Sequence, residues 1–390
     1  MAPLEPHEKK RLLACIVQEL SATPYACFDL EPLLSGTTNF TFRGHLATAL
    51  AETDEQTVII KHTTSYAALN KDFPVDISRC LFEVYALQAL NSFPAVEPAS
   101  SDSFAALSPR LYHFNSAANI QVLQDIQGVW DLREVLDAPS ADALVSQTQI
   151  ADVGRAAGAW LRRFHQWAVE PAQRFLAQEV VRNEGMRGLK CRVTCDSFIG
   201  VLENFPDIYE PHATTLGLFR DMAQLEFQRL PGLADEDDGW GVIHADFWSG
   251  NILIPSSILT PAGVTGHDRH IAIIDWESCQ FGPRAFDVGG MLGDMCERHH
   301  FKGVNAALSA MEGFISGYGP ISDALAFRVA MHAGVFLITW YNRRAPGSPL
   351  PAPLEVARAA MALGVQFIVR GWEKDKAWFK ESIFASLFTG

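Results

Sequence analysis

Two polar motifs in the second half of the chain, each adjoining apolar runs, most strongly limit the folds that this sequence can adopt. The first, VIHADFWSGNILI (242–254), places Asp246 and Asn251 five positions apart between two apolar segments. The second, HIAIIDWESCQFGP (270–283), places Asp275 at the end of a run rich in isoleucine. Short apolar runs rich in β-branched residues are typical of buried strands. Both motifs therefore predict strands that adjoin carboxylate or amide side chains.

One strand pairing is enough to bring the two motifs together. If residues 252–254 and 271–274 form a hairpin, Asn251 and Asp275 lie at the same end of that hairpin. Asp246 precedes the hairpin on a short loop, and it then faces the same space. The sequence thus predicts one site that holds two carboxylates and one amide oxygen.

Charge and composition exclude several classes of function. The chain has 390 residues, enough for two or three domains, with 48% hydrophobic and 19% charged residues, as in globular proteins. Its formal net charge of −14 disfavours nucleic acid and anionic membranes as partners, because both require a basic surface. No uninterrupted apolar run approaches the roughly 18 residues of a membrane span, and the first residues are charged where a signal peptide is apolar. The seven scattered cysteines favour reduced thiols, so we expect a cytoplasmic protein.

The order of the predicted elements divides the chain into two lobes. Strand patterns dominate the first third, as in TVIIKHT (57–63) and two runs within 110–126, and a helix is predicted from about Ser78. Long helical patterns follow, interrupted by the two motifs. We therefore predict an α+β, bilobal fold, in which a small antiparallel β lobe with one main helix precedes a larger, mainly helical lobe. The predicted boundary separates residues 1–126 from residues 127–390.

The predicted site suits phosphoryl transfer from a nucleotide. That reaction needs oxygen ligands for Mg²⁺, a cation on the phosphate oxygens, and a carboxylate that orients the acceptor hydroxyl and accepts its proton. Mg²⁺ binds hard oxygen ligands and favours one or two carboxylates with phosphate and water. Asp246, Asn251 and Asp275 supply two carboxylates and an amide oxygen. We interpret His244 as a packed loop residue and not as an acid or base.

At these residues the sequence resembles the aminoglycoside-phosphotransferase/choline-kinase superfamily, which has a protein-kinase-like fold. The motifs that carry the resemblance are H-A-D-x-x-x-x-N at 244–251 and I-I-D-W-E at 273–277, and it extends across nearly the whole chain. FWSGNILI (247–254) and DWESCQFGP (275–283) look closest to a fungal branch akin to methylthioribose kinase, which includes 4-hydroxytryptamine kinase. The resemblance implies ATP and Mg²⁺ as cofactors.

The resemblance also implies a role for each motif residue. Asp246 is the implied catalytic base, and Asn251 and Asp275 are the implied Mg²⁺ ligands. Lys61 in TVIIKH is similar to the strand lysine that pairs with nucleotide phosphates. Glu83 is similar to the helix glutamate that holds this lysine.

Three further segments resemble parts of the same family. LLSGTTNFTFR (33–43) is similar to the loop that covers the phosphates, although it has one glycine where protein kinases have three. The donors implied in that loop are Gly36, Thr37, Thr38 and Asn39. VLQDI (122–126) is similar to the hinge, so Gln124 and Ile126 are expected to offer backbone groups to adenine. Asp287 matches a buried aspartate that usually braces the catalytic loop.

The spacing after Asp275 favours a small acceptor. Only about eight residues separate it from the next predicted helix, near Pro283, which leaves no room for the long segment that seats a peptide in protein kinases. In the family, C-terminal helices wall the acceptor pocket. The candidate acceptor contacts are Glu277, Asp294, Trp340 and Tyr341. The plainer interpretations are a core helix for the two aromatic residues and a solvated helix face for Asp294.

We therefore expect an ATP- and Mg²⁺-dependent small-molecule kinase that transfers the γ-phosphate to a hydroxyl group of a small metabolite. An amine-bearing alcohol or a phenol is among the candidate acceptors. One alternative is an aminoglycoside-type antibiotic phosphotransferase, and another is a non-catalytic, kinase-fold nucleotide-binding protein. The sequence leaves open the acceptor, the preference between ATP and GTP, and whether the protein is a monomer or a homodimer.

Overall fold

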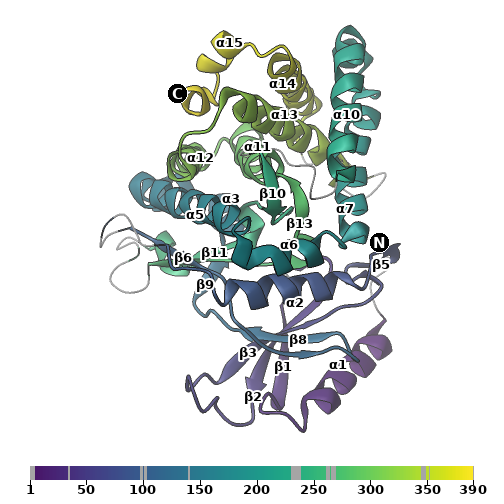
Figure 1. Ribbon diagram of the computed structural model, residues 1–390, viewed down its shortest axis with the longest axis vertical. Coiled ribbons are helices and arrows are strands. Elements are labelled where there is room, and N and C mark those ends of the chain that lie inside the picture. Colours follow the sequence, from purple (N-terminus) through teal and green to yellow (C-terminus); the bar gives the residue numbers. More distant parts are fainter. Residues whose placement is uncertain are drawn as a thin grey trace. The chain divides into compact units, whose positions relative to one another are not determined.

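The structure divides into two compact units. It is a computed structural model that describes residues 5–33, 36–96, 100, 103–138, 141–229, 239–260, 264, 269–343, 348–350 and 352–389. The first unit is formed by Met1–Ser92 and Ser108–Gln127, and the second by Phe93–Leu107 and Gly128–Gly390 (Figure 1). Residues 93–107 precede the predicted boundary at 126, yet they pack with the second unit.

The first unit is built on a five-stranded antiparallel sheet. The strands lie in the order β1 (Cys27–Leu33), β2 (Phe40–Leu46), β3 (Thr57–His62), β8 (Ile120–Gln124) and β7 (Leu111–Asn115). Apolar side chains of β2, β3 and β8 form a buried core with Ile16 and Leu20 of helix α1 (Pro6–Leu20). A short hairpin, β4 (Tyr66–Ala67) with β5 (Asn70–Pro74), precedes helix α2 (Arg79–Leu90). The predicted small antiparallel lobe with one main helix is confirmed.

Two small sheets in the second unit hold the polar motifs. One sheet has the order β6 (Ala105–Leu107), β12 (His270–Ile273), β11 (Ile252–Pro255) and β9 (Val129–Asp131). In it, Ile252 pairs with Ile273 in antiparallel register, so the predicted hairpin is confirmed. The other sheet pairs β10 (Trp240–Ile243) with β13 (Gln280–Pro283), a pairing that we did not predict. Each motif is therefore held by a strand at both of its ends.

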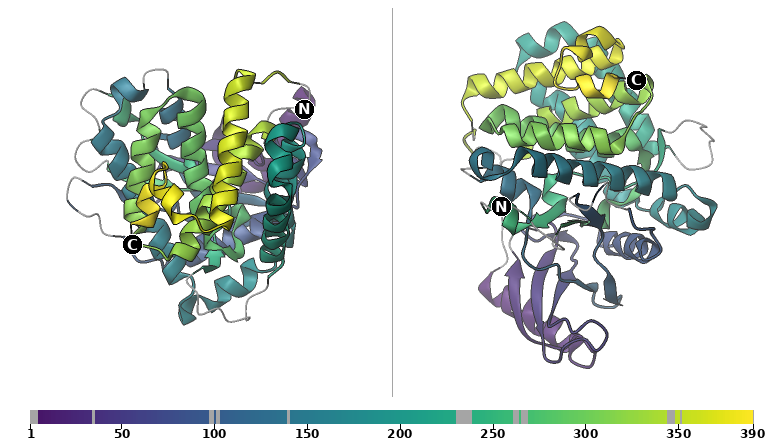
Figure 2. Two further views of the ribbon diagram at one scale, coloured as in Figure 1. Left: turned by 90° about the horizontal axis from the view of Figure 1, so that it is seen from above. Right: turned by 90° about the vertical axis from the view of Figure 1, so that its left-hand side faces the viewer.

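Helices form most of the second unit, as predicted. Those of the first half are α3 (Leu132–Asp137), α4 (Ala141–Leu144), α5 (Gln147–Trp167), α6 (Arg174–Val180), α7 (Glu184–Cys191), α8 (Ser197–Leu202), α9 (Pro206–Tyr209) and α10 (Ala213–Gln228). Those of the second half are α11 (Arg284–Lys302), α12 (Asn305–Tyr318), α13 (Asp323–Thr339), α14 (Leu354–Trp372) and α15 (Lys376–Lys380). The green and yellow helices of the second half gather in one group (Figure 2).

Helices α5 and α12 cross at unusually close range because glycines face each other's backbones. A Cβ atom on any of the four would collide with the backbone of the opposite helix; they are Gly154, Gly158, Gly313 and Gly317. At Gly313 the obstacle is the backbone carbonyl of Ala151. Backbone atoms cannot rotate away as side chains can, so this contact fixes the separation of the two helices.

We expect Gly313→Ala to lower the free energy of unfolding by about 3 kcal/mol, the upper end of typical overpacking costs, because the added methyl group must push the helices apart. Urea unfolding measures this change. The matched control is Gly217→Ala in α10, where a Cβ would meet no atom within 4 Å. Alanine there should stabilise the helix by up to about 1 kcal/mol. Equal effects of the two substitutions would contradict the close-contact argument.

Among the described residues, one helical stretch, Asp323–Arg343, is long and apolar enough to cross a membrane by length and composition alone. Of its most apolar window, 72% is buried inside the protein. Gly334 of this stretch packs against the backbone carbonyl of Gly364 in α14, a contact between core helices.

Candidate active site

Lys61 and Glu83 form a buried ion pair in the first unit. Side chains alternate along a strand, so Lys61 faces away from the core with α1 and toward α2. Its Nζ lies 2.7 Å from Oε1 and 2.9 Å from Oε2 of Glu83, and the two side chains are 9% and 2% exposed. A charge this deeply buried requires a partner. The structure therefore brings these two predicted residues together.

Arg79, the first residue of α2, braces the predicted phosphate loop. Its guanidinium donates to the Thr38 carbonyl at 3.3 Å and to Asn39 Oδ1 at 3.0 Å. The Asn39 side chain is therefore committed to holding the loop in place, and it is buried. Gly36 is half-buried and Thr37 is exposed, with its hydroxyl 3.4 Å from that of Thr38.

The predicted hinge lies at the end of β8. The backbone N–H of Gln124 donates to the Arg110 carbonyl at 2.9 Å, so this N–H group already has a partner within the first unit. The next residue, Asp125, accepts from Arg43 Nε at 2.7 Å and is 2% exposed. Ile126 follows on irregular, half-buried backbone. The Asp125 ion pair anchors this short segment to β2.

Asp246 and Asn251 contact each other in the second unit. Asn251 Nδ2 donates to the Asp246 carbonyl at 2.9 Å and to Asp246 Oδ2 at 3.2 Å. A carboxylate only accepts hydrogen bonds, so the amide nitrogen must face Asp246 and the amide oxygen must face away from it. The Asp246 side chain is 32% exposed, and its Oδ1 accepts from Lys190 Nζ of α7. Lys190 was not predicted.

His244 joins the two motifs. Its Nδ1 accepts from the Asp246 amide at 3.2 Å, so its Nε2 carries the proton and donates to the Ile274 carbonyl at 3.0 Å. The Ile274 amide in turn donates to the Asn251 carbonyl at 3.0 Å. Asp275 is thus one residue from two hydrogen bonds to the loop of Asp246. The interpretation of His244 as a packed loop residue agrees with these contacts.

Two aspartates of α11 hold the two ends of this loop. Asp287 is fully buried and accepts from the amides of His244 at 2.8 Å and Ala245 at 2.7 Å. Asp294, seven residues and two helical turns later on the same face, accepts from the Ser249 amide at 3.1 Å. Ala245 has a positive φ of 61°, an unfavourable conformation for alanine that the amide contact to Asp287 helps to fix.

Asp287 also contacts His165, at the end of α5. His165 Nε2 lies 3.0 Å from Asp287 Oδ2, and its Nδ1 lies 2.9 Å from the Tyr318 hydroxyl. Complete burial lowers the pKa of His165 although Asp287 opposes the shift, so the ring is neutral. The neutral ring donates to Asp287 and accepts from Tyr318.

We expect Asp287→Asn to lower the free energy of unfolding by roughly 3 kcal/mol, because an amide cannot accept from three donors with the strength of a carboxylate. The NH₂ group of the new asparagine would also face one of these three donors, which would then lack an acceptor. Thermal and urea unfolding measure the change, with the exposed Asp221→Asn as the control. If Asp287→Asn unfolds at the same urea concentration as the wild type, the bracing role is wrong.

Glu277 was a candidate acceptor contact because residues two apart in an extended segment point the same way, but the segment from Asp275 to Glu277 is not extended. Asp275 has a φ of 68°, in the left-handed region, and residues Trp276–Ser278 form a 3₁₀ turn. Residues two apart in such a turn no longer point the same way. Glu277 is buried, and its carbonyl accepts from Asn183 Nδ2 at 3.0 Å.

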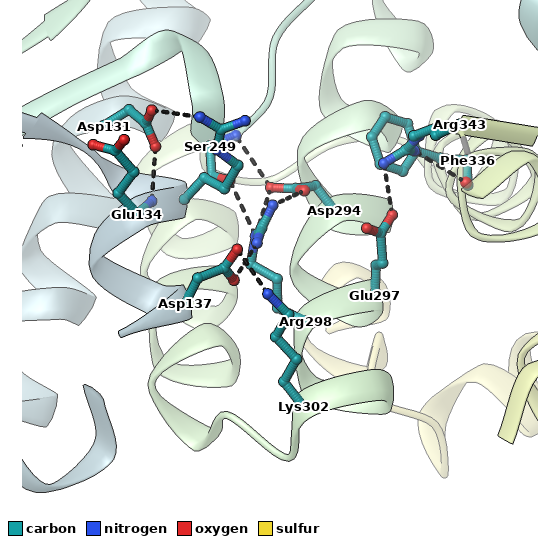
Figure 3. Close-up of polar contacts among 11 residues, drawn as sticks. Asp131, Glu134, Asp137, Ser249, Asp294, Glu297, Arg298, Lys302, Phe336 and Arg343 are labelled. Carbon is teal, nitrogen blue, oxygen red and sulfur yellow. Dashed lines mark hydrogen bonds and ion pairs between the residues drawn. The ribbon is translucent and has the colours of Figure 1, made fainter. Parts of the chain in front are cut away.

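Asp294 lies in a buried ion-pair cluster and not on a solvated helix face. Its Oδ1 accepts from Arg298 at 2.9 Å, and Arg298 also contacts Asp137 of α3 at 2.5 Å. Lys302 contacts the same Asp137 at 2.7 Å. Figure 3 shows Arg298 between Asp137, Ser249 and Asp294. Because Asp294 is completely buried among these donors, we propose a bracing role for it in place of acceptor contact.

Glu297 is a second buried carboxylate on α11. Its Oε2 lies 2.8 Å from Arg343, and its side chain is 12% exposed (Figure 3). Burial outweighs the attraction of Arg343 and raises the pKa of Glu297 to about 7. The folded protein therefore binds a proton at pH values where the unfolded chain has released it.

This pKa predicts a pH-dependent contribution of Glu297 to stability. A raised folded-state pKa stabilises the fold at low pH and loses that effect as the pH rises through about 7. Relative to Glu297→Gln, the wild type should lose roughly 2 to 3 kcal/mol of unfolding free energy between pH 5 and pH 8. Urea unfolding of both proteins across this range measures it. A constant difference between the two would contradict the raised pKa.

Trp340 and Tyr341 lie in a 3₁₀ turn, Trp340–Arg343, that follows α13. Trp340 stacks on Phe301, with ring centroids 3.9 Å apart and an angle of 17° between the planes. Tyr341 packs edge-on against Phe205 at 5.6 Å. Both residues are half-buried. Their role toward an acceptor stays a prediction.

The donor set in the second unit fits a hard cation. The Asn251 amide oxygen, turned away from Asp246, and the Asp275 carboxylate are oxygen ligands of the kind that Mg²⁺ binds. Within the described ranges, no group of three or more His, Cys, Asp and Glu residues could hold a metal. Two such side chains leave the other coordination positions of Mg²⁺ for nucleotide phosphates and water.

Four residues that contact the predicted site residues escaped the sequence analysis: Asn183, Lys190, Arg79 and Arg298. The first three lie far along the chain from their partners, Arg298 lies four residues from Asp294, and none of the four belongs to a motif. Asn183 and Lys190 lie in the stretch 170–212, where no regular pattern was visible. The one signal available was charge: basic residues within otherwise apolar helices require buried partners.

Comparisons with known proteins identify the family of this chain. The model of the phosphotransferase enzyme family, APH, matches residues 50–321. The phosphotransferase FrzJ of Cladobotryum sp is 26% identical over 98% of this chain and 97% of that protein. The 4-hydroxytryptamine kinase of Psilocybe cyanescens is 24% identical over 73% of each chain. The structure of a choline kinase from Cryptosporidium parvum, 12% identical, covers 97% of this chain and 100% of that one with a TM-score of 0.48.

The family model spans well over half of the chain, so the chain belongs to the phosphotransferase enzyme family. The predicted family and the predicted class, a phosphotransferase with an alcohol group as acceptor, are confirmed.

Proposed function

We propose that this protein is an ATP- and Mg²⁺-dependent kinase that transfers the γ-phosphate to a hydroxyl group of a small molecule. The arrangement around Asp246 carries the proposal: its carboxylate contacts Asn251, and His244 ties its loop to the residue before Asp275. Phosphoryl transfer depends mainly on positioning and electrostatic stabilisation. This arrangement supports the proposal because it holds a carboxylate beside the Asn251 amide, on a loop tied to the residue before Asp275.

Each residue of the site receives a role in this reaction. Asp246 orients the acceptor hydroxyl and accepts its proton while the acceptor oxygen bonds to the γ-phosphorus. Asn251 Oδ1 and the Asp275 carboxylate would hold Mg²⁺, which neutralises phosphate charge when bound. Lys61, fixed by Glu83 at 2.7 Å, pairs with phosphate oxygens of the nucleotide.

The remaining nucleotide contacts are proposed from the first unit. Gly36, Thr37 and Thr38 offer backbone and hydroxyl donors to the phosphates, and Gln124 and Ile126 offer backbone groups to the base. We propose ATP as the nucleotide. Location in the cytoplasm, a monomeric or homodimeric state, and the absence of nucleic acid and membrane partners stay predictions.

We propose a small amine-bearing alcohol or phenol as the acceptor. Two curated relatives are 4-hydroxytryptamine kinases, which supports an acceptor of this chemistry. Only a 3₁₀ turn and the short strand β13 separate Asp275 from α11, so a peptide has no segment there to lie on. A panel of 4-hydroxytryptamine, choline, methylthioribose and an aminoglycoside, incubated with Mg·ATP, tests this by mass spectrometry. Transfer to methylthioribose alone, which has neither an amine nor a phenol, would contradict the proposed acceptor class, and transfer to the aminoglycoside alone would contradict its small size.

We expect Asp246→Ala to reduce turnover by about 10²- to 10⁴-fold, because the acceptor hydroxyl loses the group that orients it and takes its proton. The KM for Mg·ATP should change by less than about threefold, since the nucleotide contacts remain. The exposed Asp221→Ala is the control for loss of one carboxylate. Circular dichroism establishes that the variants fold. Undiminished turnover of Asp246→Ala would refute the assignment of the base.

A further inference from the structure

The predicted base has a cationic partner from a distant part of the chain. Lys190 of α7 contacts Asp246 Oδ1, while Asn251 Nδ2 contacts Oδ2 at 3.2 Å. Each oxygen of the carboxylate thus receives one donor, and the two donors come from different elements. Since each carboxylate oxygen can accept about two hydrogen bonds, positions remain for an acceptor hydroxyl.

The helix that carries Lys190 is anchored to the second motif. Asn183, just before α7, is 1% exposed, and its Nδ2 donates to the carbonyls of Glu277 at 3.0 Å and Cys279 at 2.9 Å. Glu277 and Cys279 lie two and four positions after Asp275 in the chain. The start of α7 therefore keeps a fixed position relative to the segment that holds the predicted metal ligand.

The helix that carries Lys190 departs from regular α-helical geometry just after this residue. Residues Arg192–Asp196 form a π-helical turn, and Thr194 Oγ1 donates to the Lys190 carbonyl at 2.6 Å. An inserted π-turn costs regular hydrogen bonding and recurs at functional sites, where it changes the direction of a side chain. The π-turn therefore changes the path of the backbone directly after Lys190, compared with a regular α-helix.

We propose that Lys190 is a positioning residue for Asp246 in the reaction proposed above, on which this inference rests. Its ammonium and the Asn251 amide together set the plane of the carboxylate before the acceptor binds. In the transfer step the acceptor O–H bond breaks and its proton passes to Asp246. The acceptor oxygen bonds to the γ-phosphorus as the bond from that phosphorus to the leaving ADP oxygen breaks. A carboxylate held by two donors keeps its free lone pairs directed at that hydroxyl.

A plain surface ion pair is the competing interpretation, and such pairs contribute only about 0–1 kcal/mol to stability. The Lys190 side chain, however, is 16% exposed, and the Asp246 backbone is fixed by His244. The two interpretations differ in what they predict for turnover. A stabilising pair affects unfolding, whereas a positioning residue affects kcat with little change in nucleotide binding.

The test compares Lys190→Met, which removes the ammonium, with Lys190→Arg, which keeps a positive charge. The control is Arg192→Met, an exposed cation two residues away on the same helical segment. Rates are measured with Mg·ATP and the panel acceptor that the wild type phosphorylates fastest. We expect Lys190→Met to lower kcat by about 30-fold, within the range that misplacement of a reacting group causes. The kcat of Lys190→Arg should be at least about tenfold higher than that of Lys190→Met. The KM for Mg·ATP should stay within about threefold of the wild-type value in every variant.

Four results would overturn the inference. If the wild type turns over and Lys190→Met retains its kcat, Lys190 does not position the base, and the proposed function stands. The same holds if Lys190→Arg is as slow as Lys190→Met, or if Arg192→Met is equally slow. If the wild type transfers no phosphate to any panel acceptor, the proposed function fails and this inference fails with it. Thermal unfolding of each variant separates loss of turnover from loss of fold.

Discussion

The carboxylate of Asp287 is the group on which the arrangement of the second unit most depends. It is completely buried and accepts hydrogen bonds from two consecutive loop amides and from His165. A buried charge with fewer donors would destabilise the fold, so the donors and the carboxylate require each other. Through these bonds one side chain connects α11, α5 and the loop of Asp246.

The close contact of α5 with α12 makes this connection possible. His165 lies in the last turn of α5, and Tyr318 is the last residue of α12, so their hydrogen bond at 2.9 Å requires the two helices to run close together. The glycines permit that separation, because a side chain at these positions would collide with the backbone of the opposite helix and push the two helices apart. The packing of α5 on α12 and the geometry of the Asp246 loop are therefore linked through hydrogen bonds, although the residues involved are far apart in the sequence.

Local patterns predicted the strands, the main helices and the pairing of β11 with β12, because periodicity and β-branched runs are local properties. They failed where a contact depends on tertiary placement. Asp294 was assigned either to a solvated face or to an acceptor, yet it is buried and accepts from the Ser249 amide of a distant loop. The segment after Asp275 is not extended, because a left-handed residue at 275 turns the chain, and sequence periodicity carries no sign of such a turn. Lys190 lies 56 positions from Asp246, beyond any local pattern.

The left-handed backbone at Asp275 limits how this position can evolve. Glycine, asparagine and aspartate adopt that conformation most readily, and among them only aspartate offers a carboxylate. Local conformation and the proposed role as a metal ligand therefore favour the same residue. Asparagine or glycine at position 275 would keep this backbone conformation without strain but would lose the carboxylate.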